Sequence, residues 1–405
     1  LFSAVQSHGL SVLNHLPFET TLDRDINLQW LNPVLAYLVP QRSTLFGFSL
    51  ALIVLVLLWI AVREKLEWGG FVFAGLVAGV MPVFHVHAYG TVVALAFFWA
   101  LVNRRREWLG YFIPALVIGI PILVWMWPPQ NTANCSNMAS IGGYCIQVGW
   151  LSYTDWQKYV WLFPFDFAWF WIWNTSLLLP LLIAGQFLTR WLATAWPRWF
   201  APMWLWFVVP NLIVLQPWIW DNTKFFVYWA LLGSIVVGGV LAHLLGAGRL
   251  QAAIAVAALI LLCLSGALDL YRASDFNLNS VQFTDANGLR VAQWARTNTS
   301  PDALFVVAND HNSPIPTLAG RRELVGYPAW LWTYGLGDYV QKSDDDKSIL
   351  DGLPNAMDLV HKYGVDYVMI GPQEIPLGAN RSYWDSHGTL VYDDGEYAVY
   401  RVANA

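Results

Sequence analysis

The chain has 405 residues, of which 57% are hydrophobic and 12% are charged, and its formal net charge is -5 at pH 7. Soluble domains carry about 25% charged residues. This composition and the acidic balance exclude a cytosolic enzyme, a disordered chain and a nucleic-acid-binding protein. The 25 Trp and 17 Tyr residues fit a protein with many membrane–water interfaces, where amphipathic rings accumulate. We therefore expect a polytopic α-helical membrane protein.

Eight apolar segments are candidates for transmembrane helices, because about 20 apolar residues are needed to cross the hydrocarbon core. In chain order they are 45–62, 69–84, 90–102, 111–127, 165–188, 199–216, 225–245 and 251–269. The third segment is short, so the second and third could instead form a re-entrant pair.

Basic residues in alternate loops predict the orientation of these eight spans. They follow the first, third, fifth and seventh spans and are Arg63, Lys65, Arg104, Arg105, Arg106, Arg190, Arg198 and Arg249. Short loops rich in Lys and Arg face the cytoplasm. The external parts are then residues 1–43, read as an amphipathic segment, the loops 128–164 and 217–224, and everything after 269. This pattern predicts a multi-pass protein of a bacterial plasma membrane.

The long external loop carries Cys135 and Cys145. In an oxidising compartment these two thiols could form a disulfide bridge. Two unrelated free thiols are the alternative.

Three domains follow from the changes in composition: the segment 1–43, a transmembrane helical domain over 44–271, and an extracytoplasmic domain over 272–405. The last is richer in charge and long enough for its own core. Its pattern predicts a small α/β domain with a mixed sheet. We expect helices over 286–297 and 344–363, the latter interrupted near residue 352, strands over 303–308 and 365–370, and a hairpin over 389–402.

Two polar clusters lie at the predicted outer ends of the spans. The first holds His85, His87 and Tyr89, which could contact a substrate or phosphate, form a structural rim, or bind a metal ion. The second holds Asp221, Asn222 and Lys224 before the seventh span. Here Asp221 could cap the helix, or Lys224 and Asn222 could hold an anionic phosphate head group.

A third cluster lies in the C-terminal domain, directly after a predicted strand. It contains Asp310, His311, Arg321 and Arg322. Arg pairs match phosphate oxygens and the nearby Trp residues suit sugar faces, although the same loop could simply dock the domain onto the membrane part. Asp23 and Asp25, in the external segment 1–43, resemble a two-carboxylate motif for metal or base chemistry, although a solvated loop is the simpler interpretation.

The chain resembles the GT-C superfamily of membrane glycosyltransferases, which includes protein mannosyltransferases, and the YYY membrane proteins. The motifs that carry the resemblance are NPVL (32–35), PQR (40–42), HVHAY (85–89), WDNTK (220–224), GLRVAQW (288–294) with Thr297 and Pro301-Asp302, LAGRR (318–322), GYPAW (326–330) and HKYGVDYVMIGP (361–372). They cover most of the chain.

The resemblance implies transfer of a sugar from a polyprenyl-phosphate donor to an acceptor on the extracytoplasmic face. It also implies an acidic base in the first external loop, often assisted by a divalent ion such as Mg²⁺ or Mn²⁺. No acidic pair follows a first span here, so we expect that an N-terminal part carrying the base is missing, with Asp23 and Asp25 as the local substitutes. The expected partners are the lipid-linked donor and membrane lipids. A non-catalytic membrane protein whose outer domain binds glycan or a partner, and a transporter, are the alternatives.

Overall fold

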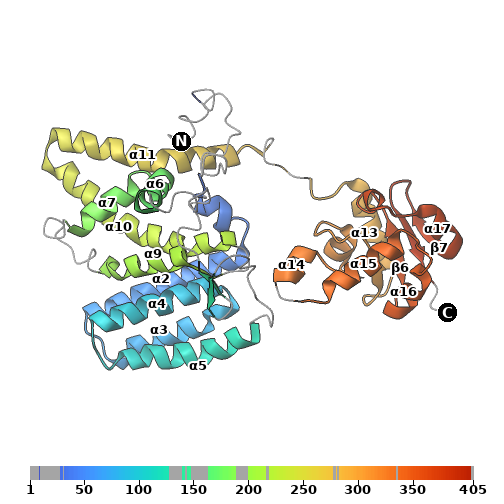
Figure 1. Cartoon of the computed structure of the whole chain (residues 1–405), viewed down its shortest axis with the longest axis horizontal. Helices are drawn as coiled ribbons and strands as arrows, with labels where there is room; N and C mark the ends of the chain where they lie inside the picture. The colour runs from blue at the N-terminus through green and yellow to red at the C-terminus, as the bar shows by residue number, and fades with distance from the viewer. Residues whose placement is uncertain are drawn as a thin grey trace. The chain divides into compact units, whose positions relative to one another are not determined.

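The structure is a computed structural model that describes residues 9, 28–30, 32–126, 139–141, 144–146, 163–187, 199–215, 219–276, 280, 282–333 and 336–402. Within these residues the chain forms two compact units, one ending at residue 276 and one beginning at residue 280 (Figure 1). The first is helical and the second combines helices with a sheet.

The helical unit places a helix within each of the eight predicted apolar segments. The helices are α2 (Arg42–Arg63), α3 (Trp68–Val80), α4 (Val86–Val102), α5 (Trp108–Met126), α6 (Phe163–Thr175), α7 (Leu178–Phe187), α9 (Pro202–Leu212), α10 (Thr223–Ala247) and α11 (Arg249–Ala273). Shorter helical turns cover Val34–Leu38, Met81–Val83 and Ile219–Asn222.

Four of the described helices are long and apolar enough to cross a membrane: α2, α5, α10 and α11. The fifth predicted segment is broken, because α6 and α7 meet at a bend of 105°. Ser176 lies in this break with a left-handed φ of 52°, which helix geometry does not allow. The helix α4 and the apolar helical stretch Trp68–Val83 are shorter. These helices fit a membrane-embedded protein: by length and composition, four of the described helices, or five if the bent pair counts as one span, could each cross a membrane.

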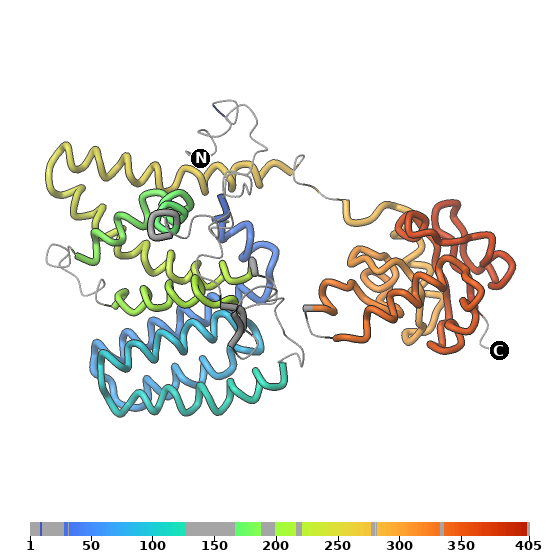
Figure 2. The backbone as a smooth tube through the Cα atoms, viewed as in Figure 1, coloured from blue at the N-terminus to red at the C-terminus, as the bar shows by residue number. Residues whose placement is uncertain are grey.

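Small residues allow the helices of this unit to approach closely, as is common in membrane bundles. A Cβ atom on Gly75 of α3 would lie 2.3 Å from the carbonyl oxygen of Tyr111 in α5. The outer sides of the unit stay apolar, since Val117 and Val124 of α5 are largely exposed. Figure 2 shows α2, α3, α4 and α5 as adjacent rods that alternate in direction.

A short antiparallel sheet joins the predicted external loop to the end of α9. Its strands are β1 (Ala139–Ile141), β2 (Tyr144–Ile146) and β3 (Ile213–Val214), and Cys145 pairs with Val214 in register. Cys135, the other half of the predicted disulfide, lies outside the described residues. Asp23 and Asp25 also lie outside them.

The C-terminal unit has the mixed sheet that its alternating pattern predicted. The strand order is β5-β4-β6-β8-β7. The strands β5, β4 and β6 are parallel to one another, β8 pairs antiparallel with β6, and β7 pairs antiparallel with β8. The strands are β4 (Leu304–Val306), β5 (Arg322–Glu323), β6 (Tyr367–Ile370), β7 (Thr389–Asp393) and β8 (Ala398–Arg401); the helices are α13 (Ala286–Asn298), α14 (Pro328–Thr333), α15 (Tyr339–Leu350), α16 (Ala356–Tyr363) and α17 (Arg381–His387). Shorter helical turns cover Ile315–Ala319 and Ile375–Leu377.

Candidate functional site

Three helices of the membrane unit begin at one small pocket. Thr44 lies in the first turn of α2, His85 is the N-cap residue of α4, and Lys224 lies in the first turn of α10. All three side chains line the pocket, together with Pro33, Tyr37, Leu38, Phe48, Val227 and Tyr228. The pocket holds about 20 Å³, which is room for a water-sized group such as one phosphate oxygen.

His85 is fixed in this pocket by its local backbone. Its ring is buried, and its Nδ1 accepts a hydrogen bond from the backbone N–H of Ala88 at 3.2 Å. A neutral imidazole with Nδ1 as acceptor carries its proton on Nε2, which lies 3.4 Å from Oγ1 of Thr44. Gly47 makes this position possible, because a Cβ atom there would lie 2.2 Å from Cβ of His85. His85 therefore presents an N–H donor beside the start of α2.

Lys224 supplies the positive charge of the pocket. Its Nζ lies 3.1 Å from a carboxylate oxygen of Asp221, and its side chain is 11% exposed against 31% for Asp221. The Tyr37 hydroxyl, which also lines the pocket, forms a hydrogen bond with the Thr223 hydroxyl. The two polar motifs that the sequence singled out, at 85–89 and 220–224, thus meet at one place.

The electrostatics of this pocket favour an anion. Each helix N-terminus carries a partial positive charge, and three of them lie here with Lys224, although the N–H of Ala88 is capped by His85, the N–H of Thr44 bonds the Gln41 carbonyl, and Lys224 is paired with Asp221. The remaining wall is mostly apolar, from Pro33, Leu38, Phe48 and Val227. An anion attached to an apolar chain matches both parts of this surface.

The other predicted residues of the membrane unit hold the structure around the pocket. Tyr89 donates to the carbonyl of Ala115 at 3.0 Å. The Asn222 side chain is fully buried and bonds three backbone groups of the segment before α10. The ring of His87 lies between His85 and Phe225, with centroid distances of 4.9 and 5.1 Å. Tyr89 and Asn222 therefore support the site from outside it.

The divalent ion that the family resemblance implies has no ligand set in the part of the chain that the structure describes. No group of three or more His, Cys, Asp or Glu side chains there is arranged to hold a metal ion. Nδ1 of His85 is also already bonded to its own helix.

The cluster predicted in the C-terminal unit is divided between the two ends of the sheet. Asp310 and His311 follow the carboxyl end of β4, whereas Arg321 precedes β5 and lies at the amino end. The Arg321 guanidinium donates to the carbonyls of Arg296, Thr299 and Ala319 and to the Thr299 hydroxyl, at 2.7 to 3.1 Å. Its donors are used within the fold. Arg322 is exposed on the edge strand β5.

Three carboxyl groups that the sequence did not suggest lie at the carboxyl end of the sheet. Asp346 and Glu374 are buried, and Glu323 is partly buried. Burial raises the pKa of Glu323 and of Glu374 to about 7, in Glu374 against the effect of its backbone hydrogen bonds. Burial, and then repulsion from the other two carboxylates, raises the pKa of Asp346 well above its ordinary value. The only sequence signal for these carboxyl groups is that Glu323 lies in a parallel strand and Glu374 follows one.

Comparison with known proteins identifies no relative from which a function could be transferred. No family model matches the chain, and no curated protein is detectably similar to it. The sequence named His85 and Lys224 as candidates but not Tyr37, Thr44 or Gly47. Tyr37 and Thr44 lie next to the motifs at 32–35 and 40–42, which could have pointed to them.

Proposed function

We propose that the chain is a membrane glycosyltransferase that takes a sugar from a polyprenyl-phosphate donor and transfers it on the extracytoplasmic face of a bacterial plasma membrane. In this proposal all eight apolar segments cross the bilayer, the basic loops face the cytoplasm, and the C-terminal unit is outside. The starts of α2, α4 and α10 then lie at the outer surface.

The observation that carries the proposal is the meeting of Lys224, His85 and three helix N-termini at a pocket with an apolar wall. A prenyl phosphate has an anionic head group, which suits Lys224 and the helix N-termini, and an apolar tail, which suits the apolar wall. The polar groups also stand at helix ends, where a lipid head group is found.

The same groups fit the leaving-group side of a sugar transfer. An acceptor oxygen bonds to the anomeric carbon while the bond between that carbon and the phosphate oxygen breaks, and the prenyl phosphate leaves as an anion. Lys224 and the helix N-termini stabilise the negative charge that develops on the phosphate. The phosphate also competes with Asp221 for Lys224, which leaves the Asp221 carboxylate free to take the acceptor proton.

The test is donor consumption by the full chain in liposomes, with radiolabelled polyprenyl-phosphate glucose and mannose as donors, glycerol and water as hydroxyl acceptors, and release of polyprenyl phosphate as the signal. We expect Asp221→Asn to lower kcat on the order of a hundredfold with donor binding retained. Lys224→Ala should weaken donor binding, and Lys65→Ala, at the opposite end of α2, should match the wild type.

Failure to consume either donor, with prenyl-phosphate binding intact, would reject the transferase proposal in favour of a binding protein. Equal activity of the wild type and Lys224→Ala would reject the placement of the phosphate.

A further inference from the structure

A second site is indicated at the carboxyl end of the parallel strands in the C-terminal unit. The strand order β5-β4-β6 means that the chain leaves β4 toward β5 on one side and later adds β6 on the other. Open α/β sheets bind ligands in the crevice outside the carboxyl ends of the strands where the order reverses in this way. The segments that follow β4 and β6 therefore border the expected position.

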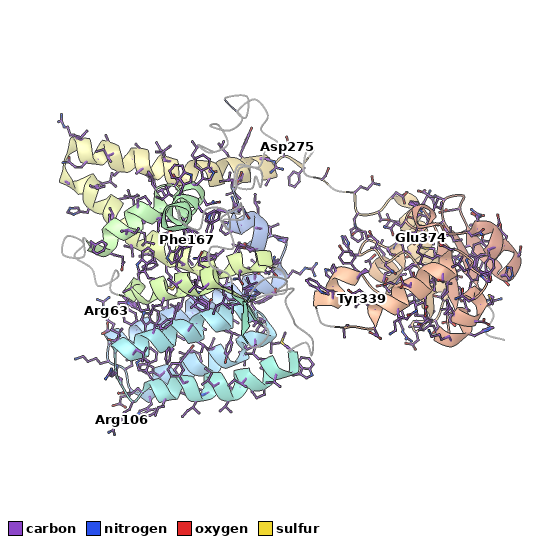
Figure 3. The ribbon with its side chains drawn as sticks, in the orientation of Figure 1. Arg63, Arg106, Phe167, Asp275, Tyr339 and Glu374 are labelled. Atoms are coloured by element: carbon purple, nitrogen blue, oxygen red, sulfur yellow. The ribbon has the colours of Figure 1, made fainter. Side chains whose placement is uncertain are left out.

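This position is closed to phosphate by the protein itself. The Glu374 carboxylate accepts the backbone N–H of Ala308, after β4, at 2.8 Å and that of Gly371, after β6, at 2.9 Å. Such backbone N–H groups are what a bound phosphate uses in related topologies. Glu374, labelled in Figure 3, is fully buried and occupies them with its two carboxyl oxygens.

The carboxyl groups around Glu374 lack a cationic partner. Asp346 of α15 is 2% exposed, and its Oδ1 has no hydrogen-bond partner. It interacts electrostatically with both Glu323 and Glu374, which places it among them. Of the ion pairs that the described residues form, none includes any of these three carboxyl groups. A buried carboxylate without a partner is costly.

Aromatic rings lie next to Asp310, whose carboxylate interacts electrostatically with Glu374. His311, next to Asp310, lies with its ring centroid 4.9 Å from that of Tyr327 and 5.9 Å from that of Trp330. The exposed fraction of Trp330 is 58%. Tyr and Trp faces attract organic cations, and the described residues show no metal-binding arrangement here.

We propose that this end of the sheet binds a small ligand carrying a protonated amino or guanidinium group. The cation pairs with the carboxyl groups of Glu323, Asp346 and Asp310, and its body lies against Tyr327 and Trp330. Because a cation favours ionised carboxylates, binding near pH 7 releases protons from the cluster.

The test is calorimetric titration of the full chain in detergent with ethanolamine, arginine amide and glucosamine. Their comparison ligands are ethylene glycol, glucose, inorganic phosphate and Mg²⁺. We expect saturable binding of at least one cationic probe, with proton release detected from the difference between two buffers of unequal ionisation enthalpy.

Four variants make the test specific. Asp346→Asn should weaken binding about tenfold or more, whereas Asp344→Asn, an exposed position on the same helix, should not. If Asp346→Asn fails to fold, Glu323→Gln serves in its place. Lys224→Ala should bind the cations normally, which separates this site from the prenyl-phosphate site.

Absence of binding by all three cations would overturn the proposal. So would equal binding of the uncharged ligands, unchanged affinity in both carboxyl variants, or binding of Mg²⁺ or phosphate alone.

Discussion

Replacing Gly47 by alanine tests how tightly α2 holds His85. The added Cβ atom would lie 2.2 Å from Cβ of His85, against 3.4 to 4 Å for ordinary contact. The two backbones must therefore separate by about 1 Å or more, because neither contacting atom is the end of a flexible side chain. The hydrogen bond between His85 and Thr44 already measures 3.4 Å, so it would be lost.

Overpacking of this kind costs about 1–3 kcal/mol. We expect Gly47→Ala to lower the thermal unfolding midpoint in detergent and to weaken the binding of farnesyl phosphate. Gly90→Ala in α4 is the matched control, since no atom lies within 4 Å of the new methyl group. The reasoning about His85 is refuted if Gly47→Ala and Gly90→Ala unfold and bind alike.

Three further predictions concern stability. Arg321→Ala should destabilise the C-terminal unit by about 2 kcal/mol, because it removes four hydrogen bonds, whereas the exposed Arg322→Ala should change it by less than about 0.5 kcal/mol; hydrogen exchange of β4 measures both. Burial raises the pKa of Glu374 to about 7, so the folded unit holds a proton that the unfolded chain releases. The free energy of unfolding should then be highest at pH 4 and fall by on the order of 3 kcal/mol as the pH rises through 7. Hydrogen exchange of the β6 amides measures this, and greater protection of β6 at pH 7 than at pH 4 would contradict the prediction. Asn222→Ala should cost about 2–3 kcal/mol in thermal unfolding, because three buried backbone groups lose their partner; an unchanged midpoint would remove its structural role.

The local elements of this protein follow from simple patterns. Apolar runs longer than ten residues became helices, and the predicted helix over 286–297 is α13 (Ala286–Asn298). The interruption predicted near residue 352 separates α15 from α16, where Gly352 has a φ of +64°. These features depend on neighbours in the sequence, which is why periodicity and turn residues are enough to find them.

Features that depend on distant contacts were not predictable. The bend of 105° between α6 and α7 is the exception, because it has a local signal: Pro180 cannot donate a hydrogen bond to the carbonyl of Ser176, which adopts the left-handed conformation at the break. Tyr37 reaches the pocket through Thr223, a partner 186 residues away. Asp310 and Arg321 are close in sequence and lie at opposite strand ends, because the chain passes along the sheet between them before β5 begins.

The affinity of the full chain for farnesyl phosphate, measured in detergent with farnesol as the uncharged comparison, tests the central claim most directly. The account predicts saturable binding of the phosphate and not of the alcohol, weakened about tenfold or more in Lys224→Ala and unchanged in Lys65→Ala. Equal affinity of the wild type and Lys224→Ala, or equal binding of farnesol, would contradict a lipid-phosphate site at the start of α10.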